Sequence, residues 1–82
     1  MKRIVFLKPA LMALKAHQNV APRLREKVAV YAADPASLAN VVTELRGSSM
    51  KRLRVGDFRI LFEETETEIL VSKIATRGSV YD

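Results

Sequence analysis

The stretch from Met50 to Phe62 constrains the fold more than any other part of this chain. Two runs that alternate between apolar and polar residues, MKRLRV and FRILF, flank the dipeptide Gly56-Asp57. Alternation with a period of two is typical of β-strands, and a Gly-Asp break suits the type I′ or type II′ turn of a tight hairpin. We therefore predict a β-hairpin over residues 50–62.

The predicted hairpin separates apolar side chains from cations. A two-residue turn sets three opposed pairs: Val55–Phe58, Leu53–Ile60 and Arg54–Arg59. The apolar residues then share one face, and Arg52, Arg54 and Arg59 share the other. Like charges directly opposite each other destabilise a strand pair unless an anion lies between or over them. A single basic pair would suggest an ordinary solvated face, but three converging arginines favour an anion-binding site.

Length and composition predict one soluble domain over residues 1–82 with a shallow core. Apolar residues make up 49% of the chain, which excludes a disordered class, and no apolar run approaches the roughly 18 residues of a membrane span. The apolar segments of residues 1–16 are interrupted by Lys8, Pro9 and Lys15, so we expect no signal peptide and a cytoplasmic protein. Because there is no cysteine, disulfides, thiolate metal sites and a Cys nucleophile are excluded.

The net charge of +5 is unevenly distributed along the chain. Residues 1–54 hold eleven Lys and Arg against three acidic residues, whereas residues 55–82 hold three against six. This asymmetry suggests that a polyanion, or an acidic protein partner, meets one side of the molecule.

The remaining segments predict an α+β fold. Lys2–Leu7 is expected to be a strand, and Ile69–Ile74 another. Apolar residues at i, i+4 and i+7, each series following a proline, predict helices from about Pro9 to His17 and from Pro22 to Ala33. The order strand, helix, helix and three strands predicts a mostly antiparallel sheet with a two-helix hairpin on one face. The arginine face would stay open.

Three connecting segments have sequence patterns that indicate their structure less clearly. Ala36–Leu45 fits a short helix near its start, or an irregular connection that packs its apolar residues under the sheet. The acidic run Glu63–Glu68 is interpreted as a solvated hairpin turn rather than a metal site, and Ala75–Asp82 as a tail. His17, at a predicted helix end, is expected to meet terminal carbonyls rather than to catalyse, and Tyr31 is expected in the core.

The segments around the hairpin resemble a known family. Leu45-Arg46-Gly47, the run KRLRVGDFRILFE over residues 51–63, an acidic turn, a strand, and RGSVY over residues 77–81 resemble the RelE/ParE superfamily of type II toxins. The pattern is most similar to the RelE-type mRNA endonucleases, with Thr76 and Gly78 where many relatives carry a His or a second basic residue.

The resemblance implies a RelE-like fold and a toxin that cleaves mRNA in the ribosomal A site, inhibits translation and is held inactive by a cognate antitoxin. The positions that match the family's catalytic residues are Arg52, Arg54, Arg59, Arg77 and Tyr81. Further contacts to mRNA or ribosomal RNA are expected from basic residues outside that set: Arg23, Arg25, Lys27, Arg46 and Lys51. The resemblance implies no metal, no small-molecule cofactor and no membrane partner.

The chemistry can be argued from the residues themselves. RNA carries its own nucleophile, the 2′-hydroxyl, so cleavage needs an oriented phosphate, a neutralised transition state and proton transfer. Arginines can supply the first two because they bind phosphate bidentately and keep their charge. They are poor general bases, which leaves Tyr81, or Lys51 if it were not on the apolar side. We expect a 2′,3′-cyclic phosphate and a 5′-hydroxyl as products.

Two other functions remain open on the sequence alone. A ParE-like toxin would inhibit DNA gyrase by protein contact, and a degenerate scaffold would only bind its antitoxin. Chains similar to ParE generally lack the convergent basic cluster, so Arg52, Arg54 and Arg59 favour the nuclease.

Overall fold

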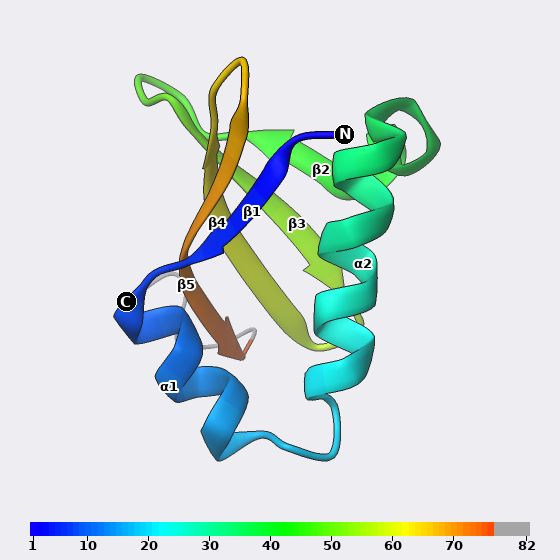
Figure 1. The fold of residues 1–82 in the computed structure, drawn as a ribbon. Coiled ribbons are helices and arrows are strands. Elements are labelled where there is room, and N and C mark those ends of the chain that lie inside the picture. The colour runs from blue at the N-terminus through cyan, green and yellow to red at the C-terminus, as the bar shows by residue number, and fades with distance from the viewer. Residues whose placement is uncertain (77–82) are drawn as a thin grey trace.

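The computed structural model describes residues 1–76, which form a five-stranded sheet with both α-helices on one face (Figure 1). The elements are β1 (Arg3–Phe6), α1 (Lys8–Ala16), α2 (Ala21–Ala33), the 3₁₀ helix η1 (Pro35–Val41), β2 (Val42–Glu44), β3 (Met50–Val55), β4 (Phe58–Glu64) and β5 (Glu68–Thr76). The strand order is β1-β5-β4-β3-β2, with β1 parallel to β5 and the other neighbours antiparallel. The predicted α+β fold is therefore confirmed. No helix of this part of the chain is long and apolar enough to cross a bilayer.

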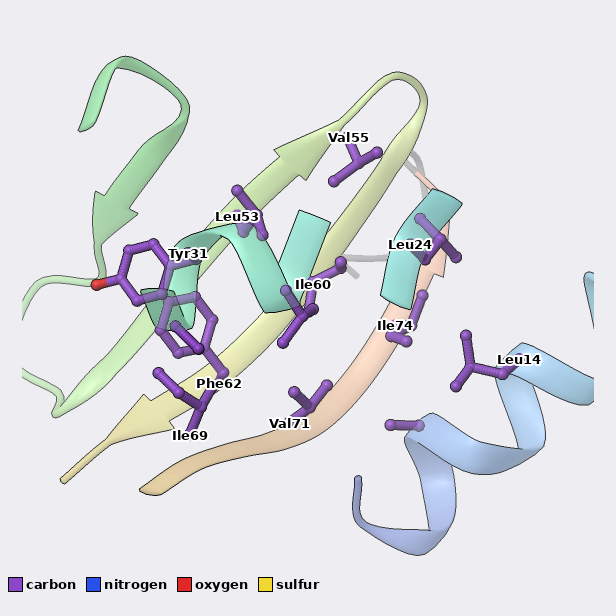
Figure 2. Packing of buried hydrophobic residues seen from close by; sticks show 13 residues of the cluster. Leu14, Leu24, Tyr31, Leu53, Val55, Ile60, Phe62, Ile69, Val71 and Ile74 are labelled. Carbon is purple, nitrogen blue, oxygen red and sulfur yellow. The ribbon is translucent and has the colours of Figure 1, made fainter. Parts of the chain in front are cut away.

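The core lies between the helices and the three central strands (Figure 2). Its largest side chains with less than 2% exposure are Leu24, Leu53, Ile60, Phe62, Ile69 and Val71. Each buried side chain of this size contributes roughly 1.5–3 kcal/mol relative to an exposed one. The hydroxyl-bearing ring of Tyr31 packs edge-on against Phe62, with 5.0 Å between ring centroids, as expected of a core residue.

The β3–β4 hairpin has the predicted register. Val55 pairs with Phe58, Leu53 with Ile60, and Arg54 with Arg59. Gly56 has a φ of +58°, and no residue other than glycine within residues 1–76 has a positive φ. A type I′ turn requires a positive φ at both central residues, so the turn is of the II′ kind, with Gly56 at the position that needs it.

A β-bulge keeps the apolar side chains of β5 on the core side. The pairing of β4 with β5 shifts between Leu61 and Phe62, so that Leu61 faces Lys73 but Phe62 faces Val71. Ser72 is the extra residue, and its hydroxyl oxygen lies 3.3 Å from the carbonyl oxygen of Leu61. Because of this insertion, Val71 and Ile74 both face the helices although they are three positions apart in the sequence, which strict alternation would not allow.

Two predicted connections differ from the structure. The segment Ala36–Leu45 contains strand β2, which was not predicted because three residues are too few to show alternation. The predicted acidic turn Glu63–Glu68 is too long: β4 extends to Glu64 and β5 begins at Glu68, so only residues 65–67 form the turn. Pairing to a neighbouring strand outweighs the low strand propensity of glutamate here.

Candidate anion-binding site

Three arginines converge on the sheet face that the helices leave open. Arg54 and Arg59 are directly opposed in the register, and Arg52 precedes Arg54 by two residues on β3, which puts all three on this face. Together with Asn40 and Val41 of η1 and Thr43 of β2 they line a hollow of about 140 Å³. That volume corresponds to roughly four or five water molecules at ~30 Å³ each. The hollow is therefore large enough for a small anionic group.

Arg59 is the most enclosed of the three. The residue is only 9% exposed, and its Nη1 donates to the carbonyl oxygens of Gly56 and Phe58 at 3.2 and 3.1 Å. Both carbonyls belong to the hairpin itself, so the turn holds the guanidinium in place. Carbonyl oxygens are neutral acceptors and do not balance its positive charge. Desolvating a cation without an anionic partner is costly. A site that tolerates this cost is suited to binding an anion.

The ion pairs among residues 1–76 lie away from this hollow. They join Lys2 to Glu64, Lys51 to Glu64, and Arg3 to Glu68. Within this part of the chain, no carboxylate comes within ion-pair distance of Arg54 or Arg59. The charges of Arg54 and Arg59 are thus not neutralised by a carboxylate within residues 1–76.

The opposition of Arg54 and Arg59 across the hairpin predicts how a substitution there changes the free energy of unfolding. Arg54→Gln removes one cation of the Arg54–Arg59 pair at an exposed position, so repulsion across the strands should fall. We expect the free energy of unfolding in urea to rise by about 0.2–1 kcal/mol at low ionic strength. The gain should shrink at high salt, because salt screens exposed charges. Arg46→Gln, in the exposed β2–β3 loop, is the matched control and should change little; an Arg54→Gln protein less stable than wild type would contradict this reasoning.

Lys51 lies on the opposite face of the sheet, within a polar cluster near α2. Its Nζ donates to Glu64 Oε1 at 2.7 Å, and Tyr31 Oη donates to the same oxygen at 2.7 Å. Lys2 Nζ binds the other carboxylate oxygen at 2.8 Å. The hydrogen bond to Glu64 raises the pKa of Lys51. An ammonium group held in this way cannot accept a proton, and it does not face the arginines.

The pKa of Glu64 reflects the same contacts. Burial alone would raise the pKa of this carboxyl group, but hydrogen bonds from Lys2, Lys51 and Tyr31 outweigh burial and lower the pKa to about 2. Burial and the bond to Glu64 in turn raise the pKa of Tyr31. Glu64 is therefore a partly buried structural carboxylate, with 13% of its side chain exposed. The sequence analysis placed it in a solvated turn, and only its position two residues beyond Phe62, the last residue of the alternating run, indicated that it shares the face of Phe62.

The other basic residues expected to bind RNA do not form one surface. Arg23 and Lys27 of α2 line a second hollow together with Arg54. Arg25 instead lies over the ring of Phe6, with 5.0 Å from Cζ to the centroid, on the side of α1. Arg46 is exposed in the loop before β3, whereas Arg54 lies near the other end of that strand.

The remaining candidate residues are distributed as follows. Arg77 and Tyr81 lie outside the described residues. His17 follows the last residue of α1, and its ring meets Phe58 edge-on at 5.1 Å on the helix side of the sheet. No group of three His, Asp or Glu among residues 1–76 is placed to hold a metal ion. Asn40 and Thr43 were missed by the sequence analysis, because they belong to the segment whose structure it left open.

Comparison with known proteins identifies the fold. No family model and no curated protein sequence matches this chain. A solved chain of the archaeal RelE-RelB complex from Pyrococcus horikoshii OT3 matches with a TM-score of 0.77 and 22% identity, over 95% of this chain and 97% of that one. The RelB-RelE antitoxin-toxin complex from Methanococcus jannaschii gives a TM-score of 0.73 and 22% identity, over 95% of both chains. A YafQ mutant from E. coli gives 0.78 and 13% over the full length of both.

Proposed function

Because this chain has the fold found in RelE-RelB complexes and in YafQ, we propose that it is the toxin of a type II toxin–antitoxin pair and cleaves mRNA in the ribosomal A site. The observation that carries the nuclease activity is that Arg59 is only 9% exposed as a residue, lacks a carboxylate partner within residues 1–76 and pairs with Arg54 across the hairpin. The expected anion is the phosphate of an RNA strand.

The proposed reaction uses the RNA's own hydroxyl. The 2′-hydroxyl gives up its proton as its oxygen attacks the adjacent phosphorus, the bond from phosphorus to the 5′-oxygen breaks, and the leaving oxygen takes up a proton. The products are a 2′,3′-cyclic phosphate and a 5′-hydroxyl. Arg52, Arg54 and Arg59 would hold the phosphate and neutralise the charge that develops on its oxygens.

Proton transfer requires a residue other than these arginines, which keep their protons at physiological pH. Lys51 is unsuitable because Glu64 holds its ammonium on the far face. By family resemblance, we assign the acceptance of the 2′-hydroxyl proton to Tyr81 and a further phosphate contact to Arg77. Arg77 follows Thr76 in the sequence, and Thr76 pairs with Phe58, next to Arg59. Arg77 is therefore one residue along the chain from a strand position that neighbours the site.

We propose that the antitoxin binds in the groove between α1 and α2. This groove has a volume of about 620 Å³ and is lined by Leu11, Leu14, Lys15, Gln18, Ala21, Pro22 and Arg25. Leu11 is 42% exposed and the adjacent Met12 60% exposed, so α1 leaves neighbouring apolar side chains uncovered beside the groove. An amphipathic helix with acidic residues would cover the apolar side chains and meet Lys15 and Arg25.

The function can be tested by expressing the chain and mapping mRNA ends by primer extension. We expect growth arrest with cuts that follow the reading frame of translated messages, and none in messages whose start codon is removed. Co-expression of the cognate antitoxin, which the proposed function expects to be encoded next to this gene, should restore growth. Mass spectrometry should find a 2′,3′-cyclic phosphate at the new ends. An SOS response without cuts would instead favour a gyrase inhibitor, and a 3′-hydroxyl end would refute the mechanism.

A further inference from the structure

The arginine hollow continues around the edge of the sheet. Strand β2 pairs with β3 only at Lys51, Arg52 and Leu53, so no strand of the described chain covers the outer edge of Arg54 and Val55. The 3₁₀ helix η1 lies beside this gap instead. The gap opens a passage from the arginine face to the helix face.

A second hollow, of about 310 Å³, occupies this passage. It is lined by Arg23, Lys27, Leu38, Asn40, Val41, Leu53, Arg54, Val55 and Gly56. Asn40, Val41 and Arg54 line both this hollow and the arginine hollow. Residues common to both linings make the two hollows neighbours that meet at the edge of β3.

The second hollow has its own positive charge. Arg23 and Lys27 are one helical turn apart on α2, a spacing at which like charges repel. Neither takes part in the ion pairs formed within residues 1–76, although Glu26 lies between them in the sequence. The guanidinium of Arg23 extends over the hairpin turn, where a side chain on Gly56 would begin 3.7 Å from Nη2. Two cations from a helix thus reach the hairpin that carries the phosphate site.

We infer that Arg23 and Lys27 bind a second phosphate, adjacent in the strand to the phosphate held by Arg52, Arg54 and Arg59. The RNA backbone would pass from the open sheet face around Arg54 and Asn40 to the N-terminal half of α2. This inference rests on the proposed function, since it requires RNA in the arginine hollow. It assigns these two cations to the bound strand itself rather than to ribosomal RNA.

Arg25 provides a matched control on the same helix. Its guanidinium lies over Phe6 and lines the groove between α1 and α2, so it does not face the passage. An Arg25→Gln variant loses the same charge as Arg23→Gln from the same element. Any general effect of losing one positive charge is therefore common to these two single variants, and Arg25→Gln combined with Lys15→Gln, in the same groove, matches the two charges lost in Arg23→Gln/Lys27→Gln.

The test measures binding of 2′-O-methyl oligonucleotides, which lack the nucleophile, to the purified chain. Wild-type affinity should rise from a mononucleotide to a hexanucleotide. In the Arg23→Gln/Lys27→Gln double variant the hexanucleotide should bind about tenfold more weakly, since charge-assisted bonds to one phosphate are lost, while mononucleotide binding is unchanged. The slope of log affinity against log salt concentration should fall by about 0.7, the value for one phosphate on a single strand. Arg25→Gln, alone or combined with Lys15→Gln, should leave this length dependence intact.

Several outcomes would overturn the inference. Wild-type affinity that does not rise with length would exclude a second phosphate contact, and so would an Arg23→Gln/Lys27→Gln variant that binds the hexanucleotide as well as Lys15→Gln/Arg25→Gln does. An Arg23→Gln/Lys27→Gln variant that binds oligonucleotides normally but cleaves mRNA poorly on the ribosome would assign the two cations to ribosomal RNA. Failure of the proposed function is separate, because it would appear as an absence of mRNA cuts on expression of the wild-type chain.

Discussion

Arg59→Gln should lower mRNA cleavage by about 10²–10³-fold, the usual effect of removing one preorganised donor from the charge that develops in a transition state. Glutamine is a shorter polar side chain that has neither the charge nor the forked donors of arginine. The loss should lie mainly in the rate of the bound complex, measured in single-turnover cleavage on programmed ribosomes. Arg25→Gln, the same substitution at a position that contacts Phe6, should cleave at close to the wild-type rate.

The conservative variant separates charge from geometry at this position. Arg59→Lys keeps the positive charge but cannot contact both hairpin carbonyls and a phosphate with a planar group. We expect its rate to lie between those of wild type and Arg59→Gln. Thermal unfolding and antitoxin binding of each variant would show that the fold persists. A fully toxic Arg59→Gln protein would refute the site.

Glu64→Gln should destabilise the fold by about 1–2 kcal/mol at pH 7. The carboxylate accepts hydrogen bonds from Tyr31, Lys51 and Lys2, which the neutral amide cannot replace at equal strength. The difference between the ordinary pKa of 4.5 and about 2 corresponds to roughly 3 kcal/mol at ~1.36 kcal/mol per unit. The two lysine side chains retain 27–29% of their exposure, so solvent screening reduces the net value.

The contribution of Glu64 should depend on pH in a defined direction. Below about pH 4.5 the unfolded carboxylate takes up a proton, whereas the folded one stays charged to about pH 2. Protonation then favours the unfolded state, so the stabilisation is present above pH 4.5 and is lost as the pH falls towards 2. Urea unfolding of wild type and Glu64→Gln should therefore converge over this interval. Glu66→Gln, exposed in the neighbouring turn, should follow wild type throughout; a constant difference between wild type and Glu64→Gln would contradict the assignment.

The sequence predicted the hairpin well because two independent signals agree there. Alternation assigned Leu53 and Arg54 to opposite faces, and Gly56 marked the turn that sets the register. Short-range patterns could not predict β2, which exists because residues 42–44 meet β3, or the bulge at Ser72. Glu64 was misassigned for the same reason: its burial depends on Lys2, which lies 62 residues away in the sequence. Contacts between distant segments decide these features, and no local pattern encodes them.

The alternation of side chains along β3 limits which mutations can inactivate the anion site without unfolding the chain. Its even-numbered arginines, Arg52 and Arg54, face the open side, and its odd-numbered residues face the helices. Because the turn at Gly56 sets the register, deleting Val55 would shift this parity and direct Arg52 and Arg54 into the core while exposing Leu53. Substitution can abolish the anion site and leave a folded chain that still binds a partner. A small deletion in β3 would disrupt the core together with the site. We therefore expect inactive but folded homologues to carry substitutions in β3 and to keep its length.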